Sequence, residues 1–131
     1  MIVLDTNVIS YIFRGDHRGE FCKQRISGER PIISFQTLEE VWFGAYSNQW
    51  GERRRQELAG YLQQFEVAFP NPQVADICAR LRAERQSSGK QLRTADAWVA
   101  ATALFLACPL ATHDSDFDSI PNLQLIKSPE A

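Results

Sequence analysis

The chain has 131 residues, of which 44% are hydrophobic and 23% are charged, and its formal net charge is −2 at pH 7. This length predicts one folded domain, residues 1–131, and this balance excludes both a disordered chain and a strongly basic nucleic-acid binder. Any contact with nucleic acid therefore has to come from a local basic patch.

In the first half of the chain, short apolar runs alternate with longer helical patterns. The first run predicts a buried strand at residues 2–4, with a helix that begins near residue 8. A second strand is expected at 31–34, followed by a helix over about 36–46. The elements that complete this half are a charged amphipathic helix over 51–65 and a short strand at 66–69.

The second half continues the same alternation. Apolar residues recur with helical spacing over about 73–85, and the Ser-Ser-Gly sequence at 87–89 ends that helix. Thr94 is the expected cap of the next helix, which continues to about residue 107. The remaining elements are strands at 110–112 and 123–126. Strands that alternate with helices predict an α/β fold, a parallel sheet covered by helices on both faces.

The cysteines and the apolar stretches bear on the compartment. Cys22, Cys78 and Cys108 are far apart and form no CxxC pair, which indicates buried thiols in a reducing compartment. Residues 1–5 lack the basic and long apolar regions of a signal peptide, and the apolar stretch 95–111 is too interrupted to span a bilayer. We therefore expect a cytoplasmic protein.

Four carboxylates map onto one edge of the expected sheet. Asp5 directly follows the first strand, and Asp114 comes two residues after the fourth. Glu40 lies in the helix after the second strand, and Asp96 lies in the first turns of the helix before the fourth. Ligands of open parallel sheets bind beyond the carboxyl ends of the strands, so these acids lie where a binding site is expected.

Asp96 is the most informative of the four, because its helix is apolar on nearly all sides. A lone buried carboxylate costs several kcal/mol unless it is paired or bound to a cation. For Asp96, the alternative to a bound cation is that the helix dipole and Thr94 stabilise its carboxylate. For Asp5, the alternative is a turn carboxylate that accepts hydrogen bonds from the amides of Asn7 and Val8. The conjunction of the four acids favours a shared site over these separate explanations.

Clustered carboxylates repel one another unless a positive group lies among them. The lysines of the chain fall elsewhere, at positions 23, 90 and 127. A hard divalent cation with oxygen ligands, Mg²⁺ or Mn²⁺, is the simplest partner. Such ions lower the pKa of bound water and neutralise phosphate oxygens, which is the chemistry of phosphodiester hydrolysis. One ion and two ions are both compatible with this set of acids.

Four segments resemble, in order, the motifs of PIN-domain toxins of the VapC type. They are residues 2–10 (IVLDTNVIS), 34–44 (SFQTLEEVWFG), 95–103 (ADAWVAATA) and 112–117 (THDSDF) followed by 120–123 (IPNL). The resemblance covers residues 2–126 and implies a parallel five-stranded sheet in the order 3-2-1-4-5. It also implies a Mg²⁺- or Mn²⁺-dependent endoribonuclease that inhibits translation as the toxin of a toxin–antitoxin pair.

The resemblance further implies the residues of the site and the partners. Asp5, Glu40, Asp96 and Asp114 would form the catalytic and metal-binding set, with Asp116 as an additional acid. The groups expected to orient ligands and water are Thr6, Asn7 and Thr112. The implied partners are an RNA substrate, a second copy in a homodimer, and an antitoxin whose C-terminal arm covers the acidic site.

Two positions in these motifs leave a choice open. Helical spacing leaves both Glu39 and Glu40 off the buried face, and only the offset from Gly44 selects Glu40. His113 is expected to be a solvent-exposed loop histidine, with a phosphate contact as the alternative.

Basic and aromatic side chains suggest contacts outside the acidic set. Arg93 is expected to bind RNA phosphate, because it lies close to Asp96 in sequence. Residues 53–55, three consecutive arginines, are typical of a solvated helix face. Tyr46 and Trp50 either line a groove for a partner helix or cap the core.

Three other functions were weighed against the nuclease. A phospho-accepting receiver domain needs a second acid beside Asp5 and a lysine after the last strand, and Lys127 is too close to the chain end. A haloacid-dehalogenase phosphatase needs Asp-x-Asp, and Asn7 stands at the second position. A non-catalytic PIN-fold module that binds RNA or protein remains the alternative, although the presence of all four acids disfavours it.

Overall fold

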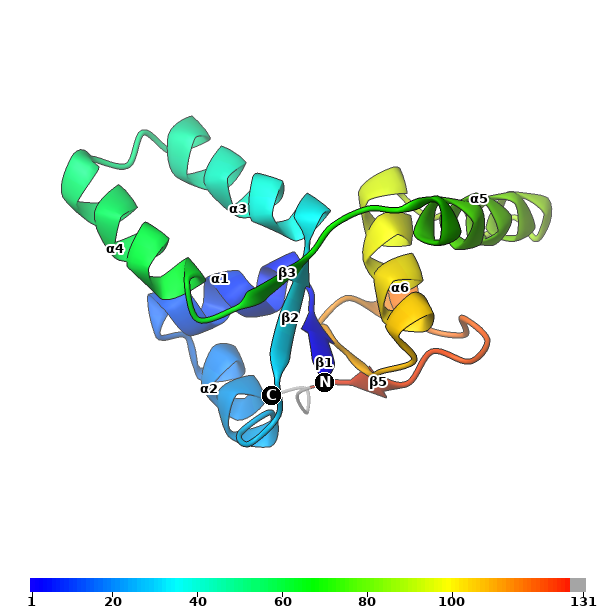
Figure 1. Cartoon of the computed structure of the whole chain (residues 1–131), viewed down its shortest axis with the longest axis horizontal. Helices are drawn as coiled ribbons and strands as arrows, with labels where there is room; N and C mark the ends of the chain where they lie inside the picture. Colours follow the sequence, from blue (N-terminus) through cyan, green and yellow to red (C-terminus); the bar gives the residue numbers. More distant parts are fainter. Residues whose placement is uncertain (128–131) are drawn as a thin grey trace.

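Five short parallel strands form one sheet, in the order β3-β2-β1-β4-β5, in the computed structural model, which describes residues 1–127 (Figure 1). The strands are β1 (Ile2–Leu4), β2 (Pro31–Ser34), β3 (Glu66–Ala68), β4 (Leu110–Ala111) and β5 (Leu125–Ile126). The expected α/β class and strand order are confirmed. Residues 128–131, the end of the expected domain, lie outside the described residues.

Helices cover both faces of the sheet. They are α1 (Thr6–Arg14), α2 (His17–Arg25), α3 (Phe35–Ser47), α4 (Glu52–Leu62), α5 (Pro72–Ser87) and α6 (Thr94–Leu106), with a short 3₁₀ turn η1 (Ser115–Phe117). Helices α1 to α4 lie on one side of the sheet, and α5 and α6 lie on the other (Figure 1). The buried side chains of the first group share one apolar core, and those of the second group share another. No helix within residues 1–127 is both long and apolar enough to cross a membrane.

The two cores arise from the alternation of side chains along the strands. Ile2 and Leu4 of β1 join the core beneath α1 to α4, while Val3 between them joins the core beneath α5 and α6. Ile32 and Ile33 of β2 divide in the same way. Because successive side chains of a strand point to opposite faces, an unbroken apolar run marks a strand that is buried on both sides.

Two of the strands lead directly into capped helices. Asp5 is the N-cap of α1, and its Oδ1 accepts a hydrogen bond from the Thr6 amide at 2.8 Å. Ser34 caps α3, and its hydroxyl oxygen accepts from the Thr37 amide at 3.0 Å. The expected cap Thr94 is instead the first residue of α6, which has Arg93 at its N-cap and no side-chain cap bond.

Helix α2 was not expected from the sequence. Its segment is strongly polar and carries Gly19 in its middle, so it shows no apolar stripe. Local chemistry stabilises it instead, because Asp16 accepts a hydrogen bond from the Arg18 amide at 2.9 Å. Glu20 in its first turn and Lys23 and Arg25 in its last turn complement the helix dipole. Packing of buried Gly19 and Cys22 then anchors the helix against the domain.

Candidate active site

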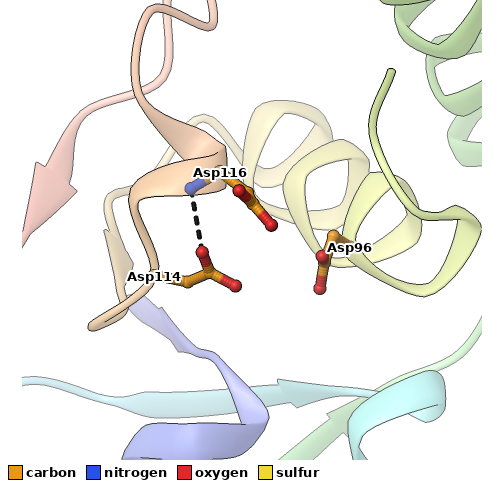
Figure 2. Close-up of side chains that lie close together, drawn as sticks. All are labelled: Asp96, Asp114 and Asp116. Carbon is orange, nitrogen blue, oxygen red and sulfur yellow. Dashed lines mark hydrogen bonds between the residues drawn. The ribbon is translucent and has the colours of Figure 1, made fainter. Parts of the chain in front are cut away.

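Three carboxylates from two segments converge at the carboxyl edge of the sheet. Asp96 lies in the first turn of α6, while Asp114 and Asp116 lie in the turn that follows β4 (Figure 2). One oxygen from each side chain lies within 4.8 Å of the other two. The Asp116 amide donates to Asp114 Oδ1 at 2.9 Å, which fixes the turn that holds both acids. Asp96 is buried, Asp114 is half-buried and Asp116 is exposed, so the group opens to solvent on one side.

Asp5 lies next to this group and is held by two hydrogen bonds. Its Oδ2 accepts from the Thr112 hydroxyl at 2.7 Å, and its Oδ1 accepts from the Thr6 amide. The amide partner of Asp5 is thus Thr6 and not Asn7 or Val8. Burial raises the pKa of Asp5 to about 6, and the negative charges of Asp96 and Asp114 add to that effect. Its carboxylate is therefore destabilised at neutral pH unless a cation approaches it.

Glu40 is the acid contributed by α3. Its Oε1 accepts a hydrogen bond from the Thr6 hydroxyl at 3.2 Å. Glu40 is half-buried, whereas Glu39 is exposed, so the Glu40 side chain is the one directed toward the other acids. Burial raises the pKa of Glu40, and the charge of Asp96 raises it further. Asp5 and Glu40 lie outside the compact group of three. The charge of Asp96 acts on both, and hydrogen bonds through Thr112 link Asp5 to Asp114.

Thr6, Asn7 and Thr112, the three polar residues predicted around the acids, each form a hydrogen bond at this edge of the sheet. The Thr112 oxygen accepts from the Asp114 amide at 3.0 Å while its hydroxyl donates to Asp5, so one side chain links two acids. Asn7 Oδ1 accepts from the His113 amide at 3.3 Å and ties α1 to the turn after β4. Thr6 links the start of α1 to Glu40 on α3.

Thr37 is a residue of the site that the sequence interpretation missed. It is fully buried, and its hydroxyl oxygen lies 3.2 Å from those of both Thr6 and Ser34. The three hydroxyls form a chain that ends at Glu40. The available signal was the spacing of Ser34 and Thr37 at the start of a helix, which is the spacing of an N-cap and its partner.

Arg93, and not a lysine, places a positive charge beside the acids. Its guanidinium forms two hydrogen bonds to the Asp96 carboxylate, with Nε 3.1 Å from Oδ2 and Nη2 3.3 Å from Oδ1. The pairing with Asp96 raises the pKa of Arg93, and Glu40 and Asp114 contribute to that rise. Arg93 thus interacts with three of the acids at once.

His113 differs from the exposed loop residue that we had expected. It is half-buried, its Nε2 lies 3.5 Å from Cys22 Sγ, and its ring meets Tyr11 edge-on at 5.1 Å. Burial lowers the pKa of His113, which favours the neutral ring. Its contacts connect α1 and α2 to the turn that carries Asp114.

A hollow beside the acids has aromatic walls from α1 and from the segment that joins α3 to α4. Trp50 lines this hollow together with Phe13 and Glu40, and Arg54 lies 3.8 Å above the Trp50 ring. Tyr46 is exposed and stacks on Trp42. Trp50 is therefore the member of the Tyr46–Trp50 pair that forms part of a groove.

The donor set fits a hard divalent cation. The three clustered side chains are all carboxylates, and Thr6 and Thr112 add hydroxyl oxygens beside them. Such all-oxygen sets are typical of Mg²⁺ and Mn²⁺ sites. Asp5, buried beside Asp96 and Asp114, adds a further carboxylate whose charge such a cation would balance.

The raised pKa of Asp5 predicts a change in stability. A group with a pKa of 3.8 when unfolded and about 6 when folded stabilises the fold below pH 3.8, and this contribution is lost as the pH rises through 6. Replacing Asp5 with Asn removes the charged form, so the metal-free variant should be more stable at pH 7.5 by about 2 kcal/mol. Urea unfolding in EDTA at pH 7.5 and at pH 4.5 measures this difference, which should shrink at the lower pH. A less stable variant at pH 7.5 would contradict the assigned burial cost.

Comparison with known proteins identifies the family. The PIN domain family model matches residues 2–123. Ribonuclease VapC1 of Haemophilus influenzae (strain R2866) is 28% identical over 125 residues, which cover 93% of each chain. The structure of VapBC-1 from nontypeable Haemophilus influenzae matches with a TM-score of 0.84 at 28% identity, covering 97% of this chain and 98% of that one. For VapBC2 from Rickettsia felis bound to a promoter DNA fragment, the TM-score is 0.85 at 23% identity, covering 96% and 98%, and that likeness concerns the fold alone.

The family match spans all four motifs and reaches every acid of the site, from Asp5 to Asp116. On this match, together with the sheet order, the chain belongs to the PIN domain family.

Proposed function

We propose that this chain is a metal-dependent endoribonuclease that acts as the toxin of a toxin–antitoxin pair and inhibits translation. The observation that carries the proposal is the meeting of Asp96, Asp114 and Asp116 at the carboxyl edge of a PIN-domain sheet. The relative named Ribonuclease VapC1 and the solved VapBC-1 complex support the substrate and the pairing.

The acids have distinct tasks in this proposal. Asp5, Asp96 and Asp114 would hold Mg²⁺ or Mn²⁺, Asp116 would contribute from the exposed side, and Glu40 would complete the set from α3. The bound ion supplies an acidified water and neutralises charge on the phosphate. Thr112 and Thr6 keep the Asp5 carboxylate in one orientation through their hydrogen bonds, so the site needs little rearrangement to bind the ion.

Induced expression in a bacterial host tests the proposal. Wild-type protein should stop growth and protein synthesis and should generate new RNA 5′ ends, whereas the Asp5→Ala variant should do neither. Asp76→Ala is the matched control, because Asp76 is exposed on α5 and pairs only with Arg80 among its ion pairs in residues 1–127. Growth arrest by wild type and Asp5→Ala alike would contradict catalysis as the cause. Binding of RNA without metal and without cleavage would favour the non-catalytic module.

The antitoxin contact is proposed at the hollow between α1, α3 and α4. This hollow combines apolar walls from Phe13, Val41 and Trp50 with the Glu40 carboxylate at the acidic site. An antitoxin arm with apolar side chains and a basic group would fill the walls and pair with the acid, and so would block access to it.

The homodimer is proposed through an aromatic patch on the opposite side of α3. Phe35 and Phe69 are both exposed, and their rings lie 5.5 Å apart. Large exposed aromatic side chains are enriched in protein interfaces. The Phe69→Ser variant should shift the protein from dimer toward monomer by about tenfold in dissociation constant, as measured by analytical ultracentrifugation. A wild type that stays monomeric, or a variant that stays equally dimeric, would contradict this interface.

A further inference from the structure

The exposed guanidinium of Arg93 pairs with the buried carboxylate of Asp96. Its side chain is 71% exposed, whereas that of Asp96 is 7% exposed, although the two groups share two hydrogen bonds. Within residues 1–127, Asp96 is the only hydrogen-bond partner of the Arg93 guanidinium. The guanidinium is otherwise surrounded by solvent, so water can replace its two hydrogen bonds when another cation competes for Asp96.

No other basic side chain in the described part of the chain is bonded to the three clustered acids. Arg85 also contacts the turn that carries these acids, but its guanidinium donates to the backbone oxygens of Asp116 and Asp118. That contact supports the turn from α5 and does not neutralise a carboxylate. Arg93 is therefore the internal counter-ion of this site.

Each oxygen of Asp96 accepts a hydrogen bond from this guanidinium. A divalent ion that binds Asp96 brings two further positive charges close to the guanidinium. The repulsion between these charges then disfavours the position of Arg93 beside Asp96. The guanidinium has open solvent around it and a side chain long enough to turn outward. A substrate phosphate at the metal-loaded acids offers it a new planar, doubly hydrogen-bonded partner.

We propose that Arg93 is a displaceable counter-ion, which neutralises Asp96 before metal binding and transfers to a substrate phosphate once a divalent ion takes that carboxylate. This inference rests on the proposed function and adds a coupling to it. Metal loading releases the arginine that contacts the RNA, so the two ligands bind with positive cooperativity. Linkage requires that RNA strengthen metal binding by the same factor.

Calorimetric titration with Mg²⁺ alone tests whether Arg93 competes with the divalent ion for Asp96. Arg93→Gln removes the competing charge and should bind Mg²⁺ about threefold to fivefold tighter than wild type, the order of magnitude of an ion pair with one exposed partner. Arg93→Lys should lie between the two. Arg53→Gln is the matched control, since Arg53 is 95% exposed on α4 and pairs with Glu57. Equal or weaker Mg²⁺ binding by Arg93→Gln would overturn the inference.

RNA binding tests whether Arg93 then transfers to a substrate phosphate, with Ca²⁺ as the probe ion and the RNA checked by gel to be intact after each titration. Arg93→Gln should lose affinity for single-stranded RNA in Ca²⁺, and its salt slope should fall by about 0.7, the value for one phosphate contact on a single strand. In EDTA the variant and the wild type should bind alike. A loss of equal size with and without Ca²⁺ would show a permanent contact and overturn the exchange, as would no loss at all.

The two proposals fail in different ways. A wild-type protein that binds no divalent ion overturns both the metal-dependent nuclease and the exchange. A wild type that binds Mg²⁺ and cleaves RNA, with the Arg93 variants unchanged in both titrations, overturns the exchange alone.

Discussion

Replacing Asp96 with Asn should lower the rate of RNA cleavage by at least about 100-fold, the scale expected when a preorganised charged group is lost from an active site. Asp96 is the buried member of the acidic group, and it shares that group with Asp114 and Asp116. Asparagine keeps the shape of the side chain and can still accept from Arg93, but it removes the negative charge that attracts a divalent ion. The loss should therefore appear in catalysis and in metal affinity rather than in folding.

Cleavage of a labelled RNA by purified protein in Mg²⁺ measures this effect. Asp76→Asn makes the same chemical change on the exposed face of α5 and should leave the rate unchanged. Circular dichroism and the melting temperature report whether the Asp96→Asn fold is intact. Activity within tenfold of wild type in a folded Asp96→Asn protein would show that Asp96 is not a catalytic residue.

Replacing Gly19 with Ala should give the largest loss of stability among single-methyl changes. A Cβ at this position would overlap the Ile12 nitrogen and the Tyr11 carbonyl carbon and would lie 2.7 Å from Ile12 Cα. These are backbone atoms of α1, which cannot turn aside as a side chain can. Helix α2 would have to move away, at a cost of about 2 kcal/mol after the better helix propensity of alanine is included. The melting temperature should fall by about 6–10 °C.

Gly60→Ala is the control for this experiment. Gly60 lies in α4 with nothing within 4 Å of its would-be Cβ, so alanine should stabilise the protein by about 1 kcal/mol. Opposite shifts of the two melting curves would show that the Gly19 effect comes from close helix packing. A stabilised Gly19→Ala protein would mean that α1 and α2 do not pack this closely in solution.

The sheet and most helices were predictable because their signals are local. Runs such as residues 2–4 are apolar on every position, as expected for strands buried on both faces, and the helix over 73–85 repeats its apolar residues at helical spacing. The order of the strands came from the resemblance, since residue patterns alone do not select strand neighbours.

Helix α2 and the contacts of His113 escaped prediction for a shared physical reason. Both depend on tertiary packing between segments remote in sequence, Cys22 lying 91 positions from His113. A polar segment with a central glycine also has the composition of a loop, so only the close approach of α1 and α2 explains why Gly19 is needed there.

The acids of the site were predictable from their places at strand ends, but their arrangement was not. Sequence spacing could not choose between Glu39 and Glu40, whereas the hydrogen bond from Thr6 distinguishes them. The pairing of Arg93 with Asp96 was also overlooked, although the two stand three residues apart at the start of a helix, where such side chains meet.

The central claim is that acids remote in sequence share one divalent ion, and a crystal grown with Mn²⁺ tests it most directly. The anomalous difference map should show a peak among the carboxylates of Asp96, Asp114 and Asp116, on the side that faces Asp5. A map with no peak at saturating Mn²⁺, or with a peak bound elsewhere while these side chains point apart, would contradict the account.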